Sequence, residues 1–270
     1  MHALRRVAAA LRPIPRGDVV MLAGNVAALE RGVRFITRDL NRGWSAERLA
    51  ALRAAGPLDA EDREQLELAD AIDQALRAAR GPAFVVDLHA TSAEGIPFAL
   101  CRDEPEARGF ASAFPVTLVL GLIEALSGTL AGLLGGRSTA VVVEGGQSSN
   151  PETTRTHEAV LWLALVAAGT LAPASAPDLA QHRETLARAR GDLPRTLSVH
   201  HRHPVAPGDA FRMEPGFANI QRIRADQLLA HDRSGAIRAP GAGFLLMPLY
   251  QAMGDDGFFL GRDADHAHEA

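Results

Sequence analysis

The hydrophobic and polar positions of this chain follow two alternating patterns. Apolar residues at helical spacing predict helices at about 2–12, 25–31, 58–80 and 156–169, and the inner stripe of the third is predicted to be Leu66, Ala69, Ile72 and Leu76. Short apolar runs predict strands at 18–23 and in AFVVDLH, PFALC, PVTLVLGL and TAVVVEGG. Strands that alternate with helices predict an α/β domain whose helical layers surround a largely parallel sheet.

The pattern changes after Gly169. The run TLAPASAPD is rich in Ala, Pro and Ser, and a polar helical segment follows it, which predicts a linker and helix over 171–192. From 193 to 270, short strand-like runs are separated by proline and glycine, as is typical of a small β-rich domain. The α/β domain is therefore predicted to occupy 1–170.

Composition narrows the classes of function. The chain has a net charge of -4, whereas a general nucleic-acid-binding protein is expected to present a basic face. Cys101 is the one cysteine, which excludes an internal disulfide and a cysteine metal cluster. No apolar run approaches the ~18 residues of a membrane span, and the N-terminal apolar stretch is too short for a signal peptide. These features predict a cytoplasmic protein without membrane or nucleic-acid partners, and they leave open whether it forms a homo-oligomer.

An arginine-rich segment, RFITRDLNRG at 34–43, carries the first candidate chemistry. Arg34, Arg38 and Arg42 each present a planar guanidinium that can pair with a carboxylate through two hydrogen bonds, and Asn41 adds an amide. Such a loop suits a small anionic ligand. The alternative interpretation is a solvated loop whose arginines form salt bridges with the protein itself.

Two predicted strands end in isolated polar residues. Asp87 and His89 follow an apolar run and point to the same face of their strand, and Glu144 ends TAVVVEGG. Ligands collect at the carboxyl ends of parallel strands, where an imidazole can bind a metal and a carboxylate can orient it. A carboxylate such as Glu144 in an apolar surrounding has a raised pKa and can act as a general base. The alternatives are a histidine that only completes a hydrogen bond and a glutamate that only caps the next element.

Four motifs occur together in one order: GN-x-x-A at Gly24–Ala27, R-F-x-x-x-D-L-N-R at Arg34–Arg42, D-L-H-x-T at Asp87–Thr91 and V-E-G-G-Q at Val143–Gln147. The chain thereby resembles the succinylglutamate desuccinylase/aspartoacylase family, which is related to the zinc carboxypeptidases. The C-terminal MPLYQ and GDDGFFL resemble the small domain of bacterial members. The resemblance implies a carboxypeptidase-like layered domain with a mostly parallel sheet, followed by a small β-rich domain.

The resemblance also implies a reaction, the zinc-dependent hydrolysis of an N-acyl amino acid or a related amide. His89 matches a zinc ligand and Glu144 matches the general acid/base. Arg34, Asn41 and Arg42 match residues that hold the small anionic acyl-amino-acid substrate. Asp87 is a candidate for orienting His89. Zinc is the cofactor expected from the resemblance.

One departure from the family pattern affects the metal site. The family supplies two further zinc ligands from an H-x-x-E motif, and no such motif precedes the arginine-rich segment here. Catalytic zinc sites normally have three protein ligands, and this sequence shows one, His89. Three hypotheses follow: a zinc deacylase, a metal-free and non-catalytic binder of a carboxylate ligand, or a truncated fragment of the enzyme. A fragment that lacks this segment would also lack a strand, which would leave an open sheet edge with exposed apolar surface.

Other residues remain without an assigned role. His200, His201 and His203 form a cluster whose members alternate between strand faces, so a shared metal is not expected there. Tyr250 is the single tyrosine and could face the cleft or pack locally. His266 and His268 lie in a polar tail that is predicted to be disordered.

Overall fold

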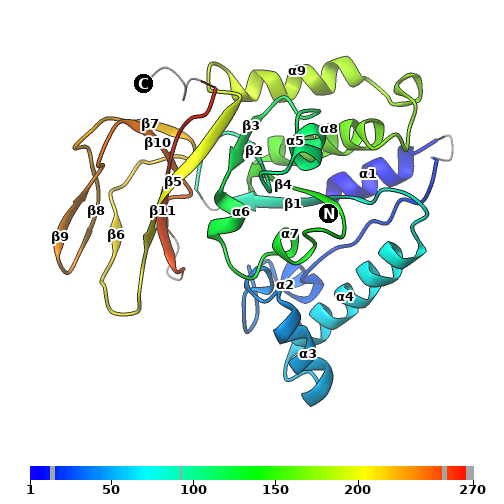
Figure 1. The fold of residues 1–270 in the computed structure, drawn as a ribbon, viewed down its shortest axis with the longest axis horizontal. Coiled ribbons are helices and arrows are strands. Elements are labelled where there is room, and N and C mark those ends of the chain that lie inside the picture. Colours follow the sequence, from blue (N-terminus) through cyan, green and yellow to red (C-terminus); the bar gives the residue numbers. More distant parts are fainter. Residues whose placement is uncertain (13–15, 92, 251–253, 266–270) are drawn as a thin grey trace.

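The computed structural model describes residues 1–12, 16–91, 93–250 and 254–265. An eight-stranded sheet crosses the whole molecule, in the order β1-β4-β2-β3-β5-β11-β10-β7 (Figure 1). Its strands are β1 (Phe84–Thr91), β4 (Thr139–Gln147), β2 (Phe98–Cys101), β3 (Thr117–Leu120), β5 (Thr196–Pro204), β11 (Asp256–Asp263), β10 (Gly243–Leu246) and β7 (Gln221–Ile223). A second sheet contains β6 (Arg212–Met213), β8 (Leu228–Asp232) and β9 (Gly235–Arg238).

Helices cover both faces of the α/β part. Figure 1 shows one group above the sheet: α1 (His2–Ala10), α5 (Pro105–Ala111), α8 (Pro151–Ala167) and α9 (Leu179–Arg190). The other helical segments of the α/β part are α2 (Val26–Arg31), η1 (Leu40–Arg42), α3 (Ala46–Ala55), α4 (Ala60–Ala78), α6 (Leu122–Ala125) and α7 (Leu130–Leu133). A short turn, η2 (Pro173–Ser175), leads to α9.

The strand β4 shows how this layering buries the core. Val141 and Val143 pack with Phe110 of α5 and Leu163 of α8, whereas Val142 packs with residues of α6 and α7 on the opposite face. The residues from Ala140 to Gly146 are all buried, because both faces are covered and strands lie on both sides.

The predicted α/β class is confirmed. Within the α/β part, β1 pairs with β4, β2 with β3 and β3 with β5 in parallel, while β2 and β4 are antiparallel. The sheet then continues through β5 into antiparallel β11, β10 and β7. The C-terminal strands form the predicted β-rich region and share an apolar cluster that includes Met213, Leu229, Leu245 and Phe258. The predicted domain boundaries stay predictions.

The prediction of a strand at 18–23 is wrong. These residues belong to no strand, although side chains alternate along them: Val19 and Met21 are half-buried, while Val20 and Leu22 are exposed. This alternation is that of an extended chain, and a strand is missing because no neighbouring strand pairs with the segment among the described residues.

The inner stripe of α4 also differs from the prediction. Ala69 is buried as expected, but Leu66, Ile72 and Leu76 are half-buried. The other buried residues of this helix are polar: Glu61, Asp62 and Gln65. The first turns of α4 therefore bury polar side chains rather than apolar ones. These polar side chains hold a loop of the candidate site, which is described below.

Candidate functional site

His89 and Glu144 lie side by side in the structure, as predicted. These residues are partners in the parallel register of β1 and β4, at the carboxyl ends of both strands. Asp87 lies two residues before His89, and its Oδ2 is 2.9 Å from Nε2 of His89. The contact is close, but the ring nitrogen is not aligned for a good hydrogen bond. The three side chains form one cluster at the end of the sheet.

Burial and charge act in opposite ways on this cluster. Burial disfavours the charged form of His89, but the neighbouring carboxylate of Asp87, helped by Glu144 and Asp39, outweighs burial and raises the pKa of His89 to about 9. Burial raises the pKa of Glu144, although the positive charges of His89, Arg34 and Arg42 oppose the shift. A buried carboxylate with a raised pKa has the property expected of a general base.

The arginine-rich segment lies within electrostatic reach of this cluster. Arg34 and Arg42 both act on the pKa of Glu144, although they are about a hundred residues earlier in the chain. Nη2 of Arg34 donates to Asp39 Oδ2 at 2.6 Å, and the other oxygen of Asp39 accepts from the backbone N–H of Asn41 at 3.0 Å. Asp39 therefore organises the turn η1 that presents Asn41 and Arg42.

The polar start of α4 holds this loop in place. Glu61 accepts hydrogen bonds from the backbone N–H groups of Ile36, at 2.6 Å, and Thr37, at 3.3 Å. Gln65 donates to the carbonyl of Gly43 at 2.6 Å. Since Glu61 and Gln65 are buried, each bond satisfies a polar side chain that would be costly to leave unpaired. Glu61 and Gln65 thus hold the arginine-rich segment against α4.

Arg38 is the arginine of the segment that pairs with a fully buried carboxylate. Its guanidinium pairs with Asp59 and, at 3.3 Å, with the fully buried carboxylate of Asp62. Arg34 and Arg42 are exposed, and Nη1 of Arg42 donates to the carbonyl of Asn41 at 3.0 Å. The alternative interpretation of a salt-bridged loop is therefore correct for Arg38 and also describes the pair of Arg34 with Asp39, whereas Arg42 keeps an exposed guanidinium beside the cluster.

A hollow of about 180 Å³ lies on this loop, lined by Arg38, Asp39, Leu40, Arg42, Gly43, Arg48 and Gln65. Another segment of the chain packs against the loop at Gly128, where an added Cβ would lie 2.2 Å from the carbonyl oxygen of Arg42. The φ angle of Gly128 is also positive, at 69°. Glycine is required there because a side chain would push the loop away.

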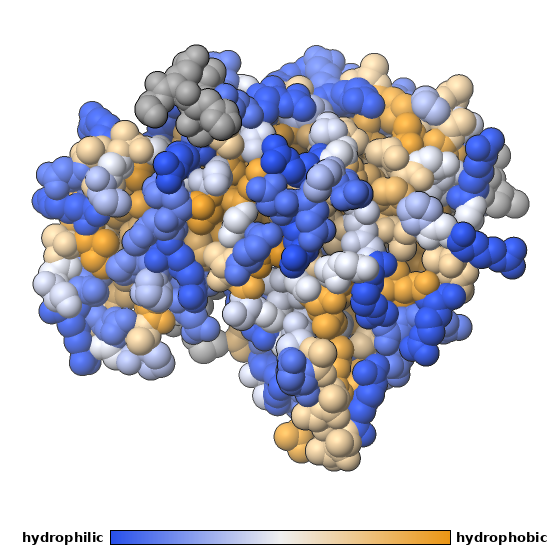
Figure 2. Space-filling model, viewed as in Figure 1, coloured by the Kyte–Doolittle hydropathy of each residue, from blue (hydrophilic) through white to orange (hydrophobic). Residues whose placement is uncertain are grey.

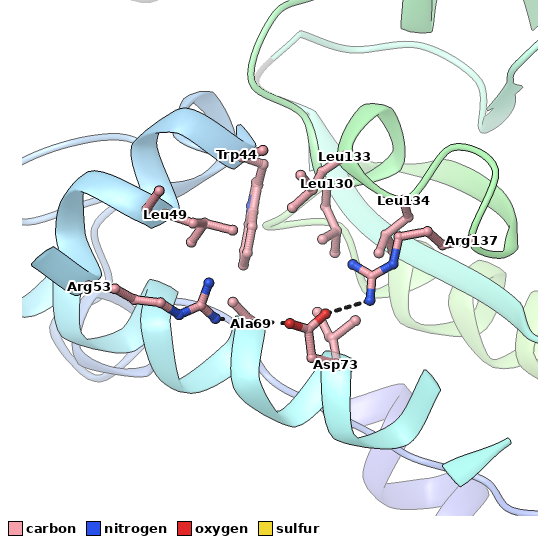
Figure 3. Close-up of a pocket in the computed structure, with 12 residues that line it drawn as sticks. Trp44, Leu49, Arg53, Ala69, Asp73, Leu130, Leu133, Leu134 and Arg137 are labelled. Carbon is pink, nitrogen blue, oxygen red and sulfur yellow. Dashed lines mark hydrogen bonds and ion pairs between the residues drawn. The ribbon is translucent and has the colours of Figure 1, made fainter. Parts of the chain in front are cut away.

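An apolar groove lies on the other side of this contact (Figure 3). It encloses about 190 Å³ between α3, α4 and α7, and its lining includes Trp44, Leu49, Ala69, Leu130 and Leu133. Figure 2 shows apolar side chains at the surface over this part of the molecule. Nη2 of Arg137 pairs with Asp73 at 2.6 Å on the rim. Trp44 connects the groove to the site, because its backbone N–H donates to the carbonyl of Gly128 at 3.0 Å.

His157 is part of the site and was missed in the sequence. It projects from α8, and its Nε2 lies 2.9 Å from the carbonyl oxygen of His89. A Cβ on Gly145 would lie 2.2 Å from the same Nε2, so glycine follows Glu144 because the imidazole packs there. Burial lowers the pKa of His157 to about 4. The one signal in the sequence was a histidine inside an otherwise apolar helical segment.

The described residues do not complete a zinc site. No group of three or more His, Cys, Asp or Glu side chains that could hold a metal occurs among them. His89 has the carboxylates of Asp87 and Glu144 beside it and is the one imidazole of this three-residue cluster. A catalytic zinc normally has three protein ligands, so the donor set of the described residues does not fit the metal.

The remaining candidates lie away from the cluster. The rings of His201 and His203 are 6.3 Å apart, and His203 stacks on Phe258 with 4.8 Å between centroids, so both take part in packing on β5. Burial lowers the pKa of His200 and of His203. The hydroxyl of Tyr250 donates to the carbonyl of Glu214 at 2.7 Å, within the C-terminal region. His266 and His268 lie outside the described residues.

Comparisons with known proteins agree with this architecture. The model of the succinylglutamate desuccinylase/aspartoacylase catalytic domain matches residues 1–134. Comparison with curated proteins found no match. Among the described residues, no helix has the length and apolar character needed to cross a bilayer.

Several solved structures share the fold. A succinylglutamate desuccinylase/aspartoacylase from Rhodobacter sphaeroides has a TM-score of 0.69 at 19% identity, with 97% of this chain and 80% of that chain covered. The product-bound ectoine utilization protein EutE (DoeB) from Ruegeria pomeroyi has a TM-score of 0.65 at 18% identity, with the same coverage. Murine aminoacylase 3 has a TM-score of 0.54 at 16% identity, with 96% and 87% covered. The family model places residues 1–134 in the succinylglutamate desuccinylase/aspartoacylase family, and the solved structures show that the chain as a whole shares their fold.

Proposed function

We propose that this chain binds a small anionic N-acyl amino acid or a related amide, and that its site catalyses hydrolysis of the acyl–nitrogen bond. The observation that supports the proposal most strongly is the convergence of Glu144, His89 and two arginine side chains at the carboxyl ends of β1 and β4. The family that residues 1–134 match is one of deacylases.

Each group has a proposed task. Arg42 and Arg34 would hold the carboxylate of the substrate, and Asn41 would donate to an amide oxygen. Glu144 would accept a proton from the attacking water and deliver it to the leaving nitrogen, so that the carbon–nitrogen bond breaks and an amine and a carboxylic acid form. Asp87 would orient His89.

Zinc stays part of the proposal as the expected cofactor, with His89 as one ligand. When bound, such an ion supplies a water of lowered pKa and polarises a carbonyl. The described residues offer His89 and do not complete the set of three ligands that a catalytic zinc normally has. A cytoplasmic location remains a prediction of the sequence.

The same observation favours a second candidate, a binder of carboxylate ligands without turnover. In this case Arg34 and Arg42 would hold an anionic ligand, and Glu144 would have no catalytic role. The two candidates share the binding step and differ in the chemical step.

One set of measurements separates the candidates. The purified chain is titrated with N-acetylaspartate and N-succinylglutamate, and release of the primary amine is followed with and without added zinc. Loss of a general base alone costs ~10²–10⁴ in rate, so Glu144→Gln should remove most turnover while binding persists. Binding without amine release would favour the non-catalytic candidate. Unchanged turnover in Glu144→Gln would contradict the role given to Glu144.

A further inference from the structure

The apolar groove between α3, α4 and α7 is a recess of which the proposed reaction makes no use. It encloses about 190 Å³. Several of the side chains around it are buried: Trp44 is 6% exposed, Ala69 5% and Leu134 1%. Protein interiors are close-packed, with few voids larger than a water molecule. An unfilled space of this size among buried side chains is therefore a formed recess with room for a ligand.

The size and the lining of the groove fit one aromatic ring. A protein cavity of about 150 Å³ that is lined by Leu, Ile and Phe side chains binds benzene. The groove is somewhat larger, so it has room for a ring and a short substituent. Figure 3 shows the indole of Trp44 between Leu49 and the two leucines of α7, Leu130 and Leu133. A ring in the groove can therefore pack on aliphatic side chains and also meet the indole edge-to-face or in an offset stack.

Arginines at the mouth of the groove favour an anion. Arg53 and Arg137 reach toward Asp73 from opposite sides (Figure 3), and the charged residues of the lining are these two guanidiniums and this one carboxylate. Nη2 of Arg137 donates to Asp73 at 2.6 Å, and Nη2 of Arg53 donates at 2.6 Å to Asp70, which does not line the groove. In the described part of the chain both guanidiniums bond through Nη2, so the N–H groups on Nε and Nη1 stay available to a further acceptor.

We propose that this groove is a binding site for a small aromatic monocarboxylate, a single ring that carries its carboxylate on a short linker. The ring would lie against Trp44, Leu130 and Leu133, and the carboxylate would accept hydrogen bonds from Arg53 and Arg137 at the mouth. Guanidiniums suit this task because their N–H groups lie in one plane and match a carboxylate. The groove shares no lining residue with the hollow on the arginine-rich segment, and the inference does not rest on the proposed function.

Phenylacetate is the probe, and the indole N–H resonance of Trp44 in the NMR spectrum of the isotope-labelled full chain is the reporter. The chain has two tryptophans, so Trp162→Phe identifies the resonance of Trp44. Trp162 packs in a different cluster, with Val7 and Leu171, and its resonance is the internal reference. Phenylacetamide, which lacks the charge, and acetate, which lacks the ring, are titrated in parallel. A ligand of this size is expected to bind with a Kd of roughly 1 mM.

Two pairs of variants locate the site. Ala50→Phe places a ring in the groove from α3, whereas Ala51→Phe adds the same ring at the next exposed position, which does not line the groove. Arg137→Gln removes a guanidinium from the mouth. Its matched control is Arg77→Gln, because Arg77 also lies near Asp73, at 3.5 Å, but does not line the groove. Thermal melts show whether the four variants fold.

The inference predicts a saturable shift of the Trp44 resonance with phenylacetate, a weaker response to phenylacetamide and no saturable shift with acetate. Ala50→Phe should abolish the response, and Ala51→Phe should keep it. Arg137→Gln should weaken affinity about two- to fivefold, the size expected of a solvent-exposed ion pair, and Arg77→Gln should not. Arg42→Ala should leave the response intact, because that residue does not line the groove.

Other results would overturn the inference. A Trp44 resonance that phenylacetate does not move, or equal shifts of both tryptophans, would show that the groove takes no such ligand. An unchanged response in folded Ala50→Phe, or its loss in Arg42→Ala, would place the ligand elsewhere. Equal affinity for phenylacetamide, or equal losses in Arg137→Gln and Arg77→Gln, would refute the role of the two arginines. A dimer that Ala50→Phe converts to a monomer, measured by sedimentation without ligand, would show a second copy of the chain as the occupant.

Discussion

The two edges of the eight-stranded sheet differ in how they are protected. At one edge, β7 is three residues long, and Arg222 places its guanidinium 4.8 Å from the ring centroid of Phe244. At the other edge, β1 is eight residues long and apolar over Phe84–Val86. Natural sheets avoid unwanted pairing with short edge strands and charged side chains, and β7 has both features. The edge without these two protective features is the one that carries His89.

A strand inside the sheet is more deeply buried than β1, which has a described strand on one side only. Phe259 of β11 has strands on both sides and is fully buried, whereas Phe84 of β1 is 37% exposed. Both are phenylalanines on strands of eight residues. The smaller burial of Phe84 agrees with its place at the start of an edge strand, where no described strand covers the other side.

The largest expected effect is on the free energy of unfolding when these two phenylalanines are replaced. Phe259→Ala should lower the free energy of unfolding by about 3–5 kcal/mol, because it leaves a cavity in a covered core. Phe84→Ala should lower it by less than about 1 kcal/mol, because part of the ring is already in water. Urea denaturation of both variants measures the difference. Similar losses would show that the β1 edge is as well covered as β11.

The next prediction concerns the packing behind His89. Gly145→Ala should cost about 1–3 kcal/mol, because its Cβ would meet Nε2 of His157 at 2.2 Å. The matched control is Gly81→Ala just before β1, where nothing lies within 4 Å of the added Cβ. Thermal unfolding of the two variants tests the prediction. If both behave like the parent chain, His157 does not hold the ends of β1 and β4 together.

The arginine-rich segment offers a functional contrast. Arg42→Ala should weaken binding of an anionic ligand by about 1.5–3 kcal/mol, the usual worth of a hydrogen bond to a charged group. Arg38→Ala should change affinity much less, because that guanidinium pairs with Asp59 and Asp62. Calorimetric titration with N-acetylaspartate compares them, with thermal melts to show that both variants fold. Equal, small changes would remove the basis for a carboxylate site at Arg42.

The smallest expected effect lies at the groove beside Trp44. The hydrogen bond from Arg137 lowers the pKa of Asp73 below its usual 3.8, against the opposing effect of burial. The charged pair therefore stabilises the fold above about pH 4, and this contribution is lost as the pH falls through the lower, folded-state pKa. Asp73→Asn should cost under about 1 kcal/mol at neutral pH, with the deficit shrinking in acid. A deficit that does not depend on pH would mean that shape rather than charge matters there.

Part of the fold and of the candidate site is predictable from local sequence patterns. The runs ending at His89 and Glu144 predict strands, and parallel strands bring their carboxyl ends together, so this pair was predictable. The segment 18–23 has a strand-like pattern, but a strand also requires a neighbour, which no local pattern supplies. A local pattern predicts a strand but does not show whether its pairing partner is present.

The residues that support the site were not predictable in this way. Glu61 and Gln65 are buried because the backbone of a distant loop bonds to them, and in the sequence they look like the solvent-facing side of an amphipathic helix. His157 bonds to a carbonyl 68 residues away. Such polar partners are set by the tertiary fold, and spacing along the chain does not reveal them.

The most direct test of the open edge is residue-resolved amide exchange of the unaltered chain, measured on the monomer. In β1, amides that face β4 should exchange slowly and alternate ones that face outward should exchange fast, whereas β4 should be protected along its whole length. This period of two along Phe84–Thr91 is the predicted result. Uniform protection of β1 in the monomer would contradict the account, because it would mean that this edge of the sheet is already closed.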